Sequence, residues 1–148
     1  MSNWSKIKKG ERVEIGLLQI DIVGHSKIQD TDINLKTAKD KFRSLIEGIV
    51  KTRNGLLFSW AGDGGAFMFR LNTGEGFNEM CFSAKQMLDG LPATNREITI
   101  STGFNNTISV RISCDSGMVV YDKDASQISG DFVNKFLRAC LETNFSGV

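Results

Sequence analysis

One apolar run constrains the fold of this chain more than any other feature. Residues 13–24 read VEIGLLQIDIVG, a nearly continuous apolar stretch rich in β-branched residues, with Asp21 close to its end. Such a run predicts a buried strand at the centre of a sheet. A carboxylate at the end of a buried strand is costly unless it has a partner. The segment therefore predicts a central strand, and it makes Asp21 a candidate functional residue.

A second apolar stretch is split by a glycine-rich centre. Residues 58–69 read FSWAGDGGAFMF, so AGDGG separates two arms rich in aromatic residues. Two strand-like arms around a short centre of this kind predict a β-hairpin. Taken alone, Asp63 in that centre is typical of a simple turn former.

Helical periodicity marks three further segments. Apolar residues recur at helical spacing over residues 32–52, with Asp30 or Asp32 as the expected N-cap and the RNG sequence at residues 53–55 as the stop. A second amphipathic helix is expected over residues 73–88 and a last one from about Gly130.

Two later segments read as strands. EITIS at residues 97–101 is one, and residues 108–121 are expected to form a hairpin that turns at residues 115–117. The resulting order, β-α-β-β-α-β-β-α, predicts an α+β fold. We expect a ferredoxin-like βαββαβ core with a mixed sheet and helices packed on one face.

The composition fits one soluble domain. The chain has 148 residues, of which 41% are hydrophobic and 24% charged, and a formal net charge of +1. This charge supplies no field for nucleic acid or an anionic membrane, so neither is expected as a partner. The basic run at residues 6–9 is expected to be solvated, within an N-terminal tail of residues 1–12 that precedes a domain of residues 13–148.

The cysteines and the hydropathy bear on the compartment. Cys81, Cys114 and Cys140 are odd in number and none pairs at metal-ligand spacing, which favours a reducing compartment. The chain has no apolar run of about 18 residues and no signal-like N-terminus. We therefore expect a cytoplasmic protein.

Two carboxylates fall where the predicted topology would bring them together. If the first strand neighbours the hairpin, Asp21 and Asp63 face one crevice, and a divalent cation would relieve their repulsion. Gly24 and Gly62 lie beside them, in turns that would let backbone N–H groups approach phosphate oxygens. A metal next to a phosphate cradle indicates nucleotide chemistry.

Four segments carry a family resemblance. LLQIDIVGHSKI resembles the DIvGfS/T motif of the class III nucleotidyl cyclases, and WAGDGGAFMF resembles their GDg…F hairpin. VRISCDSGMVV is similar to their vRiGihsG.v strands, and GDFVNKFLRAC to their G..vN.AaR helix. All four occur in the family's order, between residues 17 and 140. Among class III domains, the chain most resembles the bacterial antiphage pyrimidine cyclases of the Pycsar type.

The resemblance implies a set of site residues. Asp21, Asp63 and the Ile22 carbonyl would hold two divalent ions, Mn²⁺ or Mg²⁺. The substrate would be bound by the residues around these ligands, which are Val23, Gly24, His25, Ser26 and Gly62. Asn134 and Arg138, four apart on one helix face, would orient the ribose and stabilise charge at the α-phosphate; the other reading of this pair is a solvated face.

The resemblance also implies an assembly and a partner. Sites in the family form across a head-to-tail homodimer, so a homodimer is expected here. Ser59 and Gln127 stand at the base-selecting positions, where neither purine pair of the family is reproduced. We therefore expect a pyrimidine nucleoside triphosphate, UTP in preference to CTP, as the substrate. The cyclic product would activate a downstream effector in antiphage defence.

Other readings stay open at this stage. The first is an adenylate or guanylate cyclase with unusual selectors. The second is a diguanylate-cyclase-like or palm polymerase domain, which usually carries a second acid in the hairpin, where this chain has Gly64 and Gly65. The third is a cyclase-fold module that binds without turnover. Most cyclase domains also continue beyond the Asn/Arg helix, so a C-terminally shortened domain is a further expectation.

Overall fold

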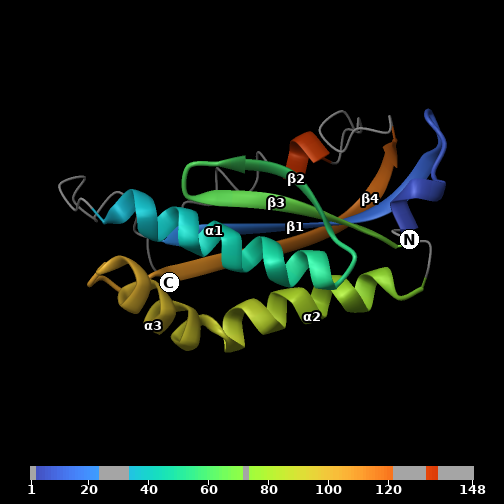
Figure 1. Ribbon diagram of the computed structural model, residues 1–148. Helices are drawn as coiled ribbons and strands as arrows, with labels where there is room; N and C mark the ends of the chain where they lie inside the picture. Colours follow the sequence, from blue (N-terminus) through green and yellow to red (C-terminus); the bar gives the residue numbers. More distant parts are fainter. Residues whose placement is uncertain (1–2, 24–33, 72–73, 122–132, 137–148) are drawn as a thin grey trace.

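A computed structural model shows how these segments are arranged (Figure 1), and it describes residues 3–23, 34–71, 74–121 and 133–136. Its elements, in chain order, are η1 (Asn3–Lys6), β1 (Arg12–Val23), α1 (Leu35–Thr52), β2 (Leu56–Ala61), β3 (Gly64–Arg70), α2 (Gly76–Asp89), α3 (Leu91–Thr102) and β4 (Ser109–Val120). Residues 133–136 add a short helical segment.

The four strands form one sheet in the order β2-β3-β1-β4. The predicted α+β class and the ferredoxin-like core are confirmed, because β1-α1-β2-β3-α2-β4 follows that plan with α3 added before the last strand. The sheet is antiparallel in all three pairings and is not the mixed sheet that we expected. As predicted, β1 is a central strand, paired on both sides.

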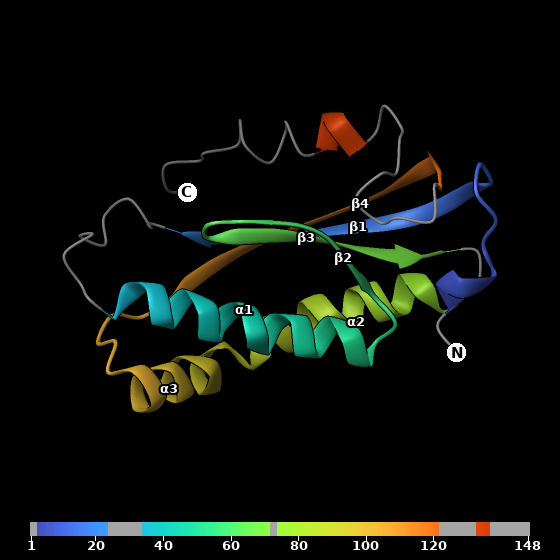
Figure 2. The same cartoon turned by 45° about the horizontal axis from the view of Figure 1, so that its top comes forward.

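The apolar run of β1 serves two cores, one on each face of the sheet. Side chains alternate along a strand, so Leu18, Ile20 and Ile22 point to one face and Val13, Ile15 and Leu17 to the other. Helices α1, α2 and α3 cover the first face, while residues 133–136 lie over the second (Figure 2). This double coverage explains why β1 is apolar at almost every position.

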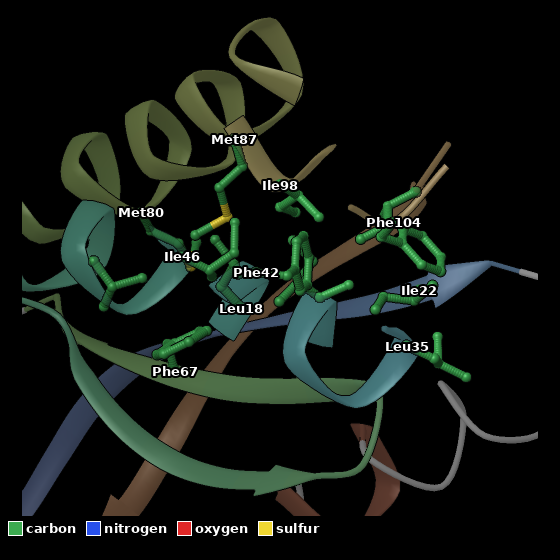
Figure 3. Packing of buried hydrophobic residues seen from close by; sticks show 14 of the residues in the cluster. Leu18, Ile22, Leu35, Phe42, Ile46, Phe67, Met80, Met87, Ile98 and Phe104 are labelled. Carbon is green, nitrogen blue, oxygen red and sulfur yellow. The ribbon is translucent and has the colours of Figure 1, made fainter. Parts of the chain in front are cut away.

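The helix-side core draws on every major element. Figure 3 shows side chains of the three helices meeting those of the sheet, with Phe42 of α1 fully buried among them. The opposite core includes Met68, Val119, Val133 and Phe136. Trp4 also belongs to it: its indole N–H donates to the Asn54 carbonyl at 3.0 Å. Part of the expected N-terminal tail therefore packs on the domain.

Helix α1 confirms the helical periodicity predicted for residues 32–52, but its N-cap is not one of the residues that we expected. The N-cap is Asn34, and its side chain makes no capping hydrogen bond. Asp30 and Asp32, the expected caps, lie outside the described residues. The predicted stop is confirmed, because the helix ends at Thr52 and Asn54 then adopts a φ of 59°, which Asn tolerates better than most residues.

The strand expected at residues 97–101 was wrong, because this segment belongs to α3. Pro92 stands in the first turn of the helix, where its missing N–H is harmless, and Gly103 ends the helix with a φ of 75°. Only Ile98 of the helix is buried, against α1 and the sheet. Burial of Ile98 in the helix-side core, together with these two helix-end signals, overrides the β-branched composition.

The hairpin expected within residues 108–121 was also wrong. Strand β4 runs without a turn and pairs with β1 over its whole length, from Arg12 opposite Val120 to Val23 opposite Ser109. Asp115, placed at the expected turn, lies opposite Leu17. The long central strand offers a partner at every position, which outweighs the local turn signal.

Two further observations concern the cysteines and the helices. Cys81 and Cys114 are exposed thiols. Within the described ranges, the helices are too short or too polar to cross a bilayer.

Candidate functional site

The turn of the β2–β3 hairpin lies against the end of β1. Asp21 pairs with Gly64, the first residue of β3, and the Ile22 N–H donates to the Asp63 carbonyl at 3.0 Å. The structure thus brings Asp21 and Asp63 to one edge of the sheet, as the sequence predicted. Both residues are half-buried, so their side chains can reach solvent.

Glycines shape this edge. Gly62 adopts a φ of 57° in the turn, a backbone conformation that favours glycine. A Cβ on Gly64 would lie 2.6 Å from the Ile20 carbonyl oxygen and 3.4 Å from Asp21 Oδ1. The absence of a side chain at Gly64 therefore lets the hairpin approach β1 and leaves room beside the Asp21 carboxylate.

The hairpin is fixed from the helix side by Trp60. Its ring covers Gly65, where a Cβ would lie 2.2 Å from Trp60 Cε3, and it packs near Phe42 and Phe67 at centroid distances of 6.3 Å each. The Arg43 guanidinium lies over the same ring at 5.4 Å. Trp60 therefore packs against the helix-side core.

Asp21 has a cationic partner that the sequence reasoning missed. Arg111 of β4 stands directly opposite Asp21 in the sheet, and its Nη2 donates to Asp21 Oδ2 at 2.7 Å. The side chains are 30% and 28% exposed, so water screens the pair. The sequence shows an arginine in the strand-like VRIS segment, but only the β1–β4 register shows that Arg111 faces Asp21.

No protein-family model and no curated protein matches this sequence. The guanylyl cyclase Cya2 has a similar structure, with a TM-score of 0.71 and 19% identity over 88% of this chain and 71% of Cya2. This chain shares the fold of that cyclase.

Two further structures share this cyclase fold. The guanylate cyclase domain of RhGC from Catenaria anguillulae, solved in complex with GTP, has a TM-score of 0.66 and 18% identity, over 86% of this chain and 72% of that domain. An adenylate/guanylate cyclase/hydrolase from Silicibacter pomeroyi has a TM-score of 0.58 and 26% identity, over 84% of this chain and 66% of that protein.

The carboxylate edge of this cyclase fold suits a hard divalent cation. Mg²⁺ and Mn²⁺ prefer oxygen ligands, and this edge carries two carboxylates, with the Ile22 carbonyl at the end of the same strand. Among the described residues, no group of three His, Cys, Asp or Glu side chains could hold a metal. A cation bound at Asp21 and Asp63 would therefore need further oxygens from water or a ligand.

Asn134 lies on the face of the sheet opposite the main helices. Val133 and Phe136 of the same short segment are buried against that face, whereas Asn134 is exposed. Its side chain is thus available to a ligand or a second chain. Arg138, its expected companion, lies outside the described residues.

The remaining predicted site residues are distributed as follows. Val23, the last residue of β1, is exposed beside the carboxylate edge. Ser59 is exposed on β2 opposite Ala66, while Phe58 next to it packs on the Val133 side of the sheet. The other expected substrate contacts lie outside the described residues; these are Gly24, His25, Ser26 and Gln127.

Proposed function

We propose that this domain is a nucleotidyl cyclase that converts a nucleoside triphosphate into a 3′,5′-cyclic nucleotide and pyrophosphate. The observation that carries the proposal is the meeting of Asp21 and the Asp63 turn at one edge of a cyclase-type sheet. This arrangement is what a divalent cation and a triphosphate need, and the matched structures include a GTP complex.

Asp21, Asp63 and the Ile22 carbonyl would hold two divalent ions, Mn²⁺ or Mg²⁺. Such ions lower the pKa of a ribose 3′-hydroxyl and neutralise a triphosphate. Residues 23–26 and Gly62 would bind the phosphate oxygens through backbone N–H groups. The 3′-hydroxyl would give up its proton to water as its oxygen bonds to the α-phosphorus. The bond from that phosphorus to the oxygen bridging the α- and β-phosphates would break, and pyrophosphate would leave with the electron pair.

Asn134 and Arg138 would act from a second chain. The exposed side of the segment that carries Asn134 faces away from the core of its own chain. In a head-to-tail homodimer, Asn134 would orient the ribose and Arg138 would stabilise the charge that develops on the α-phosphate. Each dimer would then hold two equivalent sites, and an isolated protomer would be inactive.

The preferred substrate under this proposal is a pyrimidine triphosphate, UTP ahead of CTP. Support comes from Ser59, which is exposed on β2 and can donate and accept a hydrogen bond, and from the resemblance to pyrimidine cyclases. The cyclic pyrimidine would signal to an effector in cytoplasmic antiphage defence. Cyclic product at the same level in infected and uninfected cells would contradict that role.

The test is an incubation of the purified protein with Mn²⁺ and each of ATP, GTP, CTP and UTP, with products identified by mass spectrometry. Asp63→Ala should abolish the product. Asp89→Ala is the matched control, since Asp89 is an exposed acid at the end of α2 that pairs with Lys85. It should keep wild-type activity.

The outcomes separate the readings. A cyclic pyrimidine from the wild type and from Asp89→Ala, but not from Asp63→Ala, supports the proposal in full. A cyclic purine keeps the chemistry and favours an adenylate or guanylate cyclase. Nucleotide binding without any product from the four substrates contradicts the proposal and favours a non-catalytic module.

A further inference from the structure

The two oxygens of the Asp21 carboxylate have different surroundings. Oδ2 accepts a hydrogen bond from Arg111 on the β4 side, at 2.7 Å. Oδ1 faces the β3 side, where it lies 3.4 Å from the position that a Cβ of Gly64 would take. The carboxylate therefore turns one oxygen toward an arginine and the other toward the glycine-lined hairpin turn.

This asymmetry matters for the choice of cation. Ca²⁺ accepts six to eight oxygens and often binds a carboxylate through both of them, whereas Mg²⁺ requires a compact octahedral shell. An oxygen that already accepts from a guanidinium is a poor second ligand, and the positive charge of Arg111 lies on that side. Asp21 thus presents one oxygen, Oδ1, to the divalent ions at the turn, and a second ion would have to share that oxygen.

We propose that Arg111 is a positioning residue that restricts Asp21 to one metal-binding oxygen and so disfavours Ca²⁺ relative to Mn²⁺ and Mg²⁺. The inference rests on the proposed function in one respect, that a divalent cation binds at Asp21 and Asp63. It concerns cation selectivity, which can be measured without nucleotide or turnover.

The experiment compares cation binding by the whole protein and its variants. Mn²⁺ binding is followed by the electron paramagnetic resonance signal of free Mn²⁺, and Ca²⁺ binding by its competition with Mn²⁺. The ratio of the Ca²⁺ to the Mn²⁺ dissociation constant is the readout. Loss of one positive charge strengthens the binding of both divalent ions alike, so this ratio isolates the geometry of the carboxylate.

We expect Arg111→Met to lower the ratio about fivefold, a modest change on the scale of a half-exposed ion pair. Arg111→Lys keeps a charged donor for Oδ2 and should retain the wild-type ratio. Arg12→Met is the matched control: it removes an exposed arginine at the other end of β1, about 30 Å from Asp21, and should leave the ratio unchanged. Asp21→Asn should abolish binding, and thermal melting followed by circular dichroism checks each fold.

Several results would overturn the inference. They are an unchanged ratio in a folded Arg111→Met, an equal change in Arg12→Met or Arg111→Lys, and no cation binding by the wild type. If Arg111→Met does not fold, Arg111→Ile, a β-branched residue suited to a strand, takes its place with the same expected fall in the ratio. A changed ratio without any cyclic product would refute the proposed function alone, and product with an unchanged ratio would refute this inference alone.

Discussion

Gly64→Ala tests how closely the hairpin must approach β1. The new Cβ would lie 2.6 Å from the Ile20 carbonyl oxygen, although ordinary contact begins at 3.4 Å, and the obstructing atom is backbone that cannot rotate away. The strands must then separate locally. Overpacking of this kind costs about 1–3 kcal/mol, and the loss of glycine freedom in the unfolded chain returns about 0.4–1 kcal/mol. We expect a net destabilisation of about 1–2 kcal/mol.

The same shift moves the Asp63 turn relative to Asp21. A displacement of about 1 Å at a reacting centre can cost about 100-fold in rate, so cyclase activity should fall far more than stability. Thermal melting should show a midpoint lower by about 3–6 °C, and the product assay should show the larger loss. Gly48→Ala is the control, because Gly48 is exposed in α1 with nothing within 4 Å of a Cβ.

The control should gain about 0.5–1 kcal/mol of stability and keep its activity. The reasoning is refuted if Gly64→Ala melts at the wild-type temperature, since the clash would then cost nothing. A lowered midpoint with full activity would refute only the link between the turn and the site.

Three further predictions test the fold and the site. Phe42→Ala empties a fully buried position in the helix-side core and should cost about 3–5 kcal/mol in urea unfolding; a loss below about 1 kcal/mol would contradict the packing. Asn95→Ala removes the amide that donates to the Ile108 carbonyl at 2.9 Å and accepts from its N–H at 2.7 Å; we expect a loss of about 1–3 kcal/mol, and an unchanged urea midpoint would argue against this brace. Chelation with EDTA should abolish cyclic-nucleotide formation and added Mn²⁺ should restore it, whereas turnover that persists in EDTA would exclude the proposed role of Asp21 and Asp63.

The sequence determined the elements whose signals are local. The run at residues 13–24 is apolar on both faces of a strand, so it is stable only where both faces are buried. The structure places this strand at the centre of the sheet, between two cores. The glycines around Asp63 fixed the hairpin turn because their backbone permits it. The pairing of Asp21 with this turn followed from the predicted ferredoxin-like order. The roles of both acids stay a prediction.

Tertiary structure decided what local signals left ambiguous. EITIS has a strand-like composition, yet it lies in α3, where Ile98 is buried in the helix-side core and the Pro92 and Gly103 signals suit a helix. Strand β4 continues through its expected turn because β1 pairs with it throughout.

The partner of Asp21 was decided in the same way. Arg111 is 90 residues away in sequence, and their contact depends on one strand register that no local pattern encodes. Spacing along a chain specifies backbone geometry over a few residues, but the contacts between distant strands arise only when the whole sheet has formed.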